Sequence, residues 1–289
     1  MKGLQREKKY AEDLLMKVAS GKIYDLEHPR FQGMPIYPLS KPGFFYSLFR
    51  HHRGAFEEGK TPRRTTASGN IFMMDQTGTH IDALCHQAYD LKLHGELSID
   101  LSIETPWGFT RLGAETIAPI IRRGLLLDIA SLHGRSSLQE GYLVSKKDLL
   151  DTCRKEGVTP SEGDVVLVRT GSGQFWTDES RYLKSAGVSL KATEWLGEKK
   201  VFAVGADNLS WEDPTIKDRK TGENLLCHIH LLVRKGIYII ENLRLEELSA
   251  ARCFVFLFIG LPIKIKGATG TPIRPIAIGA PSKEDQGVG

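Results

Sequence analysis

Four side chains that could bind a metal ion or transfer a proton lie within eleven residues: Gln76, His80, Asp82 and His86. Their spacings are all even, and side chains alternate in direction along an extended chain, so all four could leave one face of a strand. Gly78 lies inside this segment and disfavours an uninterrupted helix. Imidazole nitrogen and carboxylate oxygen suit a borderline divalent ion such as zinc or manganese. A buried cluster of hydrogen-bonded polar groups is the alternative interpretation.

A second group of candidate residues lies near the C-terminal end of the sequence. His228 and His230 begin a pattern typical of a helix, and Gly236 is expected to end it. The apolar residues 237–240 then predict a strand that ends at Glu241. A helix followed by a strand can present a histidine and a glutamate to one point. The residues alone leave open which of the two histidines takes part.

The elements that must position these residues are buried strands that alternate with helices. Near-continuous apolar segments are typical of strands covered on both faces, and Ser145 is a suitable N-cap for the helix that follows it. The predicted helices cover residues 114–123, 145–156 and 190–199, and the predicted strands lie within residues 124–130, 163–171 and 201–206. This alternation predicts an α/β fold.

Composition excludes several classes of protein. The hydrophobic content of 41% and charged content of 26% are ordinary for a globular protein. The net charge of +4 comes without a basic stripe interleaved with aromatic residues, so we expect no nucleic-acid partner. There is no secretory signal and no apolar segment as long as a membrane span. The four cysteines form no CxxC pair and are expected to be free thiols, which points to a cytoplasmic protein.

The chain is long enough for one large domain or two small ones. Residues 1–21 predict an amphipathic helix, and residues 281–289 predict a frayed tail. No internal repeat or linker divides residues 22–280, which are expected to form a single domain. Aromatic and basic residues are dense in residues 42–62, which could form a mobile lid or a contact between subunits.

The segment GTHIDALCH resembles the signature of the cyclase family, which contains bacterial kynurenine formamidase and isatin hydrolase. The family pattern is His-x-Gly-Thr-His-x-Asp-x-Pro-x-His. His80, Asp82 and His86 match its second histidine, its aspartate and its last histidine. Gln76 stands in the place of the first histidine, and Leu84 in the place of the proline.

Further segments resemble the family in the same order along the chain. They lie at residues 23–38, 122–128, 163–171, 205–210 and 267–275. The resemblance covers roughly residues 22–278 and implies the swivelling β/β/α fold of this family, with a mixed sheet flanked by helices. It also implies assembly into homodimers or homotetramers. His28 and residues 34–38 could reach the rim of the pocket, or their segment could be only an edge strand and a turn.

The resemblance and the residues together predict one divalent ion, Mn²⁺ or Zn²⁺, bound by Gln76, His80, Asp82 and Glu241. The neutral amide oxygen of Gln76 shifts the preference from zinc toward manganese, although a second ion that shares Asp82 stays open. His86 is expected to carry protons. The family spacing His-x-x-x-Leu-x-x-x-Gly selects His228 over His230, and the selected histidine would bind a second metal or stabilise a tetrahedral intermediate.

The predicted function is metal-dependent hydrolysis of an amide or ester bond, cyclic or open, in a small and partly aromatic molecule. Trp107 and Phe109 could line its binding wall or only pack within the fold, and Asp207 could orient a ligand histidine or cap the following turn. Arg274 could bind a carboxylate in the fold or on a substrate. Nothing in the sequence selects N-formylkynurenine over isatin-like lactams or lactones. The alternative is a catalytically silent binding protein that kept the fold, which the replacement of the first histidine by Gln76 favours.

Overall fold

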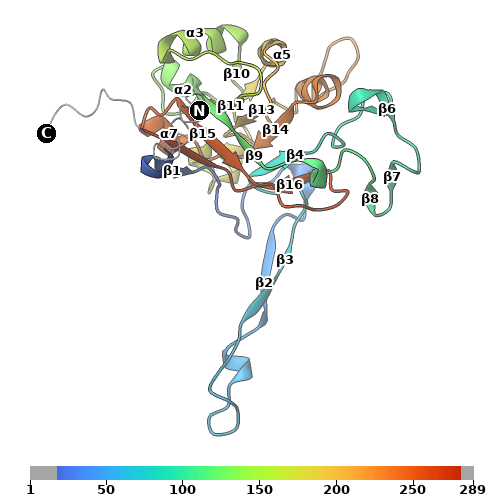
Figure 1. Cartoon of the computed structure of the whole chain (residues 1–289), viewed down its shortest axis with the longest axis vertical. Helices are drawn as coiled ribbons and strands as arrows, with labels where there is room; N and C mark the ends of the chain where they lie inside the picture. Colours follow the sequence, from blue (N-terminus) through green and yellow to red (C-terminus); the bar gives the residue numbers. More distant parts are fainter. Residues whose placement is uncertain (1–17, 281–289) are drawn as a thin grey trace, which may run out of the picture.

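A computed structural model describes residues 18–280 of the chain (Figure 1). The predicted N-terminal helix lies almost wholly outside these residues, and the predicted tail lies outside them. Within residues 18–280, no helix is long and apolar enough to cross a membrane.

A nine-stranded mixed sheet forms the centre of the molecule (Figure 1). Its strands follow the order β1-β17-β15-β9-β11-β13-β14-β4-β16. The four strands β9, β11, β13 and β14 are parallel, and β15 and β4 continue the sheet in antiparallel pairing on either side. The strands are β1 (Lys22–Asp25), β4 (His80–Asp82), β9 (Ile120–Asp128), β11 (Val165–Arg169), β13 (Ala203–Ala206), β14 (Tyr238–Glu241), β15 (Val255–Gly260), β16 (Gly270–Pro272) and β17 (Ile276–Gly279).

Apolar residues fill consecutive central positions of the parallel strands, such as 125–127 on β9 and 165–168 on β11, and these positions are buried on both faces of the sheet. Leu125 and Val166 belong to one core, which includes the helices, whereas Leu126 and Leu167 belong to a second core on the opposite face. The helical elements are α2 (Ile129–Leu132), α3 (Lys146–Glu156), α4 (Glu179–Tyr182), α5 (Leu190–Glu198), α6 (Leu226–His228), the π-helix η6 (Ile229–Lys235) and α7 (Glu246–Ala250). The sequence therefore predicted the α/β class and the buried strands correctly.

Local sequence signals explain the ends of α3. The hydroxyl of Ser145 accepts a hydrogen bond from the backbone N–H of Asp148, whose carboxylate accepts one from the backbone N–H of Ser145. This reciprocal capping satisfies two donors that the helix cannot pair internally. Gly157 ends the helix in the left-handed conformation, with φ of 67°. The predicted helix over residues 145–156 is confirmed.

The predicted helix over residues 114–123 is wrong. A short 3₁₀ turn, η4 (Ala114–Thr116), is followed by β9, which begins at Ile120. Ile121 pairs with Ile259 on β15. Pro119 disfavours a helix at this point, and pairing with a strand more than a hundred residues away decides the conformation.

A long two-stranded hairpin, here called the arm, projects from the body of the molecule (Figure 1). Its strands are β2 (Phe45–Arg50) and β3 (Ser68–Phe72), and its tip carries η2 (Arg53–Ala55). Most of the segment predicted to be a lid or a subunit contact belongs to this arm. Its exposed apolar side chains are those of Phe45, Tyr46, Leu48, Phe49, Phe56, Ile71 and Phe72.

Four short strands form two small ribbons between the candidate site segment and β9. These are β5 (Lys92–Leu93) with β6 (Leu97–Ser98), and β7 (Glu104–Thr105) with β8 (Gly108–Phe109). Trp107 lies at the turn between β7 and β8 and is 92% exposed. A further parallel pair joins β10 (Leu143–Val144) and β12 (Gly187–Val188), and the remaining 3₁₀ turns are η1 (Pro38–Ser40), η3 (His94–Glu96) and η5 (Ser172–Phe175).

Candidate metal centre

Two neighbouring strands bring the predicted ligands together. His80 on β4 pairs directly with Glu241 on β14 in antiparallel register. Asp82 lies two residues beyond His80 on the same strand, so the two side chains leave the same face. Cross-strand partners have Cβ atoms about 5 Å apart. His228, at the end of α6, completes the group.

Each carboxylate of this group gives one oxygen to each histidine. Nε2 of His80 lies 3.5 Å from Oδ1 of Asp82 and 3.4 Å from Oε2 of Glu241. Nε2 of His228 lies 3.7 Å from Oδ2 of Asp82 and 3.2 Å from Oε1 of Glu241. All four side chains are buried. Most of these distances are longer than a good hydrogen bond, so the four groups converge without satisfying one another.

Unsatisfied oxygens mark this point as suitable for a cation. Both oxygens of Asp82 and Oε1 of Glu241 are buried and have no hydrogen-bond partner within residues 18–280. Burying a carboxylate without donors or a cation is costly. Two carboxylates with two imidazoles are a donor set that zinc and manganese accept. The residues present therefore fit the divalent ion that the sequence predicts.

Without a bound ion, His80 and His228 have raised pKa values. Burial by itself lowers the pKa of His80, but contacts with Asp82 and Glu241 outweigh burial and raise the pKa to about 10. Burial likewise lowers the pKa of His228, and contacts with Glu212 and Glu241 raise it well above its usual value. Burial raises the pKa of Asp82, but the nearby charge of His86 and the contact with His80 lower it to about 2. Protons and metal ions compete for the same nitrogens.

Hydrogen bonds on the far sides of the imidazole rings fix how the two histidines face the centre. Nδ1 of His80 lies 2.7 Å from the carbonyl oxygen of Gly78. Oε1 of Glu212 lies 2.7 Å from Nδ1 of His228. Both contacts assign the proton to Nδ1 and leave Nε2 free to face the carboxylates.

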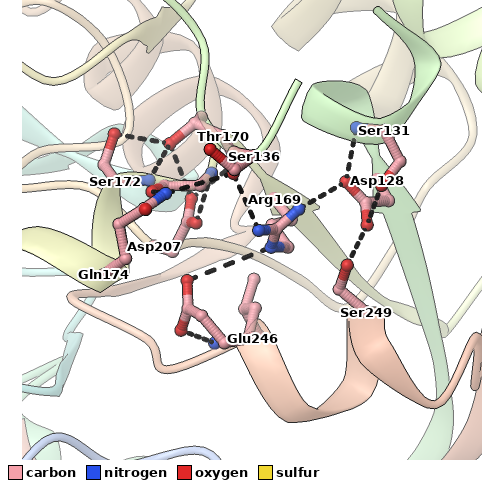
Figure 2. Close-up of polar contacts among 12 residues, drawn as sticks. Asp128, Ser131, Ser136, Arg169, Thr170, Ser172, Gln174, Asp207, Glu246 and Ser249 are labelled. Carbon is pink, nitrogen blue, oxygen red and sulfur yellow. Dashed lines mark hydrogen bonds and ion pairs between the residues drawn. The ribbon is translucent and has the colours of Figure 1, made fainter. Parts of the chain in front are cut away.

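Glu212 is a site residue that the sequence analysis did not identify. The sequence left Asp207 open as the partner of a ligand histidine or as the cap of the following turn, and its carboxylate instead binds the loop that follows β11. Asp207 accepts hydrogen bonds from the backbone N–H groups of Thr170 and Gly171 and from the Thr170 hydroxyl (Figure 2). The signal that could have found Glu212 is a carboxylate a few residues beyond the same predicted strand.

Asp207 belongs to a separate polar cluster at the carboxyl ends of the parallel strands (Figure 2). Arg169, the last residue of β11, forms an ion pair of 2.9 Å with Asp128, the last residue of β9. Its Nε lies 3.9 Å from Oε1 of Glu246. Arg169 and Asp128 are buried. This cluster holds strand ends and loops together beside the centre.

Gln76 and His86 lie next to each other at the rim of the centre. Nε2 of Gln76 lies 3.2 Å from Nδ1 of His86 and donates a hydrogen bond of 2.7 Å to the hydroxyl of Thr269. One ligand atom from each of Asp82, His86 and His228 falls within a span of 4.8 Å. The position of His86 therefore suits metal binding as well as the predicted proton transfer.

His230 lies away from this group. Its Nε2 packs against Gly197, where an added Cβ would come within 2.7 Å, and it finds no hydrogen-bond partner in the described part of the chain. Of the two histidines that the sequence left open, His228 is the one beside Asp82 and Glu241. Arg274 forms an ion pair of 2.6 Å with Asp25 and is thus engaged within the fold.

A cavity of about 330 Å³ opens onto the centre. Its walls come from four segments: residues 35–40 before the arm, residues 76–87 around β4, residues 209–228 before and within α6, and residues 241–242 at the end of β14. The expected contribution of residues 34–38 to the rim agrees with this lining. Trp107 and Phe109 do not line the cavity, and Phe109 packs against the second core, which is the alternative that the sequence left open. The ribbon that carries them turns Trp107 toward solvent.

Comparison with known proteins places this geometry in a family. The pattern of the cyclase family, described as putative cyclase, matches residues 24–213, which is more than half of the chain. Kynurenine formamidase of Bacillus thuringiensis subsp. konkukian is 26% identical over 211 residues, which are 72% of this chain and 78% of that protein. Kynurenine formamidase of Salinibacter ruber is 27% identical over 214 residues, 74% of this chain and 80% of that protein. These relatives are hydrolases.

Solved structures share the fold. A crystal structure described as a novel cyclase is 28% identical, covers 91% of this chain and 89% of its own, and has a TM-score of 0.80. An isatin hydrolase bound to the product analogue thioisatinate is 20% identical, and the match covers 95% of this chain and 99% of that protein, with a TM-score of 0.69. The mixed sheet with flanking helices is thus the architecture of these proteins, and the chain belongs to the cyclase family.

Proposed function

We propose that this chain is a metal-dependent hydrolase that cleaves an amide or ester bond, cyclic or open, of a small molecule. The observation that carries the proposal is the pair of buried carboxylates, Asp82 and Glu241, which lie between His80 and His228 and leave three of their four oxygens without a hydrogen-bond partner in the described residues. The similarity to proteins named kynurenine formamidase and isatin hydrolase supports this assignment.

His80, Asp82 and Glu241 are the proposed ligands of one divalent ion, with the amide oxygen of Gln76 as a fourth. His228 is the proposed ligand of a second ion, should one bind, because each carboxylate already offers it a separate oxygen. We propose manganese or zinc as the ion, on the strength of the mixed oxygen and nitrogen donors. When bound, such an ion polarises a carbonyl group and makes a water molecule more acidic.

His86 is the proposed proton carrier. It lines the cavity, is only partly buried, and contacts the side chain of Gln76 through Nδ1. In hydrolysis the hydroxyl group joins the acyl carbon while the C–N or C–O bond breaks, and the leaving atom takes up the proton. A histidine at the cavity wall can accept the proton from water and return it to the leaving atom. If no second ion binds, the raised pKa of His228 lets Nε2 carry a proton as well as Nδ1, and the ring would then stabilise negative charge on the carbonyl oxygen.

The test is to measure the metal content of the full chain and its hydrolysis of a small panel of aryl esters and anilides, with and without added Mn²⁺. We expect bound metal and turnover that a chelator removes. Asp82→Asn keeps the shape of the side chain and should abolish both, whereas Asp213→Asn, outside the centre, should abolish neither. A chain that binds neither manganese nor zinc would refute the assignment.

The second candidate function is a binding protein without catalysis. The observation that favours it is Gln76, whose amide nitrogen is engaged by Thr269 and His86. Binding of metal and of small neutral ligands without turnover of any ester or anilide would identify this case.

We also propose that the chain forms a homodimer or homotetramer through the arm. A two-stranded ribbon is marginally stable on its own in water, and the arm exposes Phe45, Phe49 and Ile71. A second copy of the chain is the occupant that would bury them. Sedimentation equilibrium should show an oligomer for the natural chain and a smaller species for Phe49→Ser. A natural chain that stays monomeric would refute this proposal.

Two further proposals concern the whole chain. Residues 22–280 are proposed to be a single domain, because the first and last strands of the sheet pair with each other, Lys22 with Gly279. A cytoplasmic location is proposed because all four cysteines are buried free thiols.

A further inference from the structure

We propose that the cavity selects neutral, largely apolar substrates and rejects substrates that carry a carboxylate or an amino-acid headgroup. This inference rests on the proposed hydrolase function and adds the class of substrate to it. The observation behind it is the charge of the cavity walls.

The cavity lacks a cationic side chain that could pair with a substrate carboxylate. Among the residues that the structure describes, no lysine or arginine lines it. Its ionisable lining residues are His80, His86, His228 and Glu241, which all belong to the centre. The other walls are apolar or neutral, and include Ile36, Tyr37, Leu39, Leu209, Leu225 and Asn224.

Cations close in sequence to these walls do not line the cavity: Lys41, which follows Ser40, is exposed, and others are engaged elsewhere or line another cavity. The guanidinium of Arg30 donates to the carbonyl oxygens of Thr77 and Thr79 and pairs with Glu27. It lies behind Gly78, where an added Cβ would meet Arg30 Nε at 3.0 Å, and therefore supports the back of the wall. Lys217, Arg219 and Lys220 line a different cavity, together with Leu143 and Ile216.

The energetic consequence follows from desolvation. A carboxylate that leaves water for the walls away from the metal centre loses solvation that no cationic side chain there restores. At the inner end, the charges of Asp82 and Glu241 balance that of one divalent ion, so the centre offers little net positive charge to a second anion. An aryl or alkyl group gains about 25 cal/mol for each Å² of apolar surface that it buries against Ile36, Leu209 and Leu225. A difference of about 1.4 kcal/mol between the binding free energies of the two substrates corresponds to tenfold selectivity.

Matched substrates test this preference on the full chain loaded with Mn²⁺. Phenyl acetate is compared with 4-acetoxybenzoate, and formanilide with 4-formamidobenzoate, so that each pair differs by one remote carboxylate. We expect kcat/KM to be at least about tenfold higher for the neutral member, with the difference mainly in KM. N-formylkynurenine, which carries a carboxylate and an ammonium group, should be a poor substrate. Equal values within both pairs, or higher values for the carboxylates, would overturn the proposal.

A binding experiment separates this inference from the proposed function. Acetophenone and 4-acetylbenzoate are ketones of similar shape without a hydrolysable bond, and their affinity can be measured by ligand-observed NMR. If no ester or anilide is hydrolysed, the catalytic function fails, yet tighter binding of acetophenone still supports the neutral cavity. Equal or tighter binding of 4-acetylbenzoate contradicts it.

A substitution at the mouth of the cavity adds the missing cation. Leu39 lines the cavity and is 83% exposed, so Leu39→Arg should fold normally. We expect it to reduce the ratio of neutral to carboxylate kcat/KM at least about threefold, by supplying a counter-ion. Leu101→Arg is the matched control, because Leu101 is 93% exposed and lies outside the cavity. If the two variants keep the same ratio as the natural chain, wall charge does not set the selectivity and the proposal is wrong.

Discussion

Oε1 of Glu212 accepts hydrogen bonds from both N–H groups of His228, 2.8 Å from the backbone nitrogen and 2.7 Å from Nδ1. Its other oxygen accepts from the backbone N–H of Cys227 at 2.8 Å. One buried carboxylate therefore fixes both the start of the helix and the direction of the imidazole ring. The proton stays on Nδ1, and Nε2 faces Asp82 and Glu241.

Glu212→Gln tests this relationship. The amide keeps the length of the side chain but loses the charge, and its NH₂ group must face an N–H donor of Cys227 or His228. We expect the affinity for Mn²⁺ to fall by about 10- to 100-fold, as is usual when the partner of a ligand histidine is lost. Isothermal titration with Mn²⁺ measures this, and Asp213→Asn, the neighbouring residue, is the control. Unchanged affinity in Glu212→Gln would show that Glu212 only caps the helix.

The pKa of His80 predicts how metal binding depends on pH. A histidine whose folded pKa is raised to about 10 adds stability that is complete below its unfolded pKa of about 6.5 and is lost as pH rises through 10. The ion-free chain should therefore lose stability between pH 6.5 and 10. Mn²⁺ must displace that proton, so its apparent affinity should rise by up to about tenfold per pH unit.

Thermal unfolding with and without Mn²⁺ at pH 6.0, 7.2 and 8.5 measures this effect. The increase in Tm on adding Mn²⁺ should grow steadily with pH, and binding at pH 7.2 should release protons in calorimetry. His80→Ala should release fewer protons than the natural chain. A metal-dependent increase in Tm that is constant over this range would contradict the competition between protons and metal.

Asn242 connects the two strands that carry the candidate ligands. It follows Glu241, its Nδ2 donates to the carbonyl of Gly78 at 3.1 Å, and that carbonyl also contacts Nδ1 of His80. Its Oδ1 accepts from the hydroxyl of Tyr182 at 2.8 Å. It holds a left-handed conformation with φ of 57°, which costs most residues about 1 kcal/mol or more and costs glycine little.

Two substitutions separate the side chain of Asn242 from its backbone conformation. Asn242→Ala should destabilise the fold by about 1–3 kcal/mol, because it leaves polar partners unpaired and keeps the strained φ. Asn242→Gly should be less destabilising by about 1 kcal/mol. Both should weaken Mn²⁺ binding to a similar degree, since both free the Gly78 carbonyl. Urea unfolding and Mn²⁺ titration give the two readouts, and natural affinity in Asn242→Gly would refute the positioning role.

The sequence was sufficient to predict the site residues that lie on regular strands. The even spacing of His80 and Asp82 was visible because a strand alternates, and Glu241 was visible because an apolar strand ends there. Glu212 was missed because its partner, His228, lies sixteen residues away across an irregular loop. The helix predicted over residues 114–123 failed for a similar reason, because β15 is remote in sequence and decides the conformation of β9.

The arm shows a different limit of sequence reasoning. Its aromatic residues predicted that the segment contacts another surface, but a mobile lid and a subunit contact have the same composition. Only the paired strands β2 and β3, extended away from the body, distinguish a projecting hairpin from a lid folded over the cavity (Figure 1). The resemblance to the family implied a mixed sheet but the order of its strands was not predicted, since local patterns carry no information on which distant strands pair.

Glu156, at the last position of α3, predicts a pH-dependent loss of stability away from the metal centre. Burial raises the pKa of this carboxyl group to about 8, although the backbone N–H of Asp128 opposes the shift. A carboxyl group whose pKa is higher in the folded chain than in the unfolded chain stabilises the fold while it is protonated. The free energy of unfolding should therefore fall as pH rises from about 4.5 to 8. Glu156→Gln removes this titration, and we expect it to gain at least about 1 kcal/mol over the natural chain at pH 8.5 and nothing at pH 4.5. Urea unfolding at both pH values measures the difference, with the exposed Glu140→Gln as control, and an equal effect at the two pH values would show that Glu156 is charged throughout.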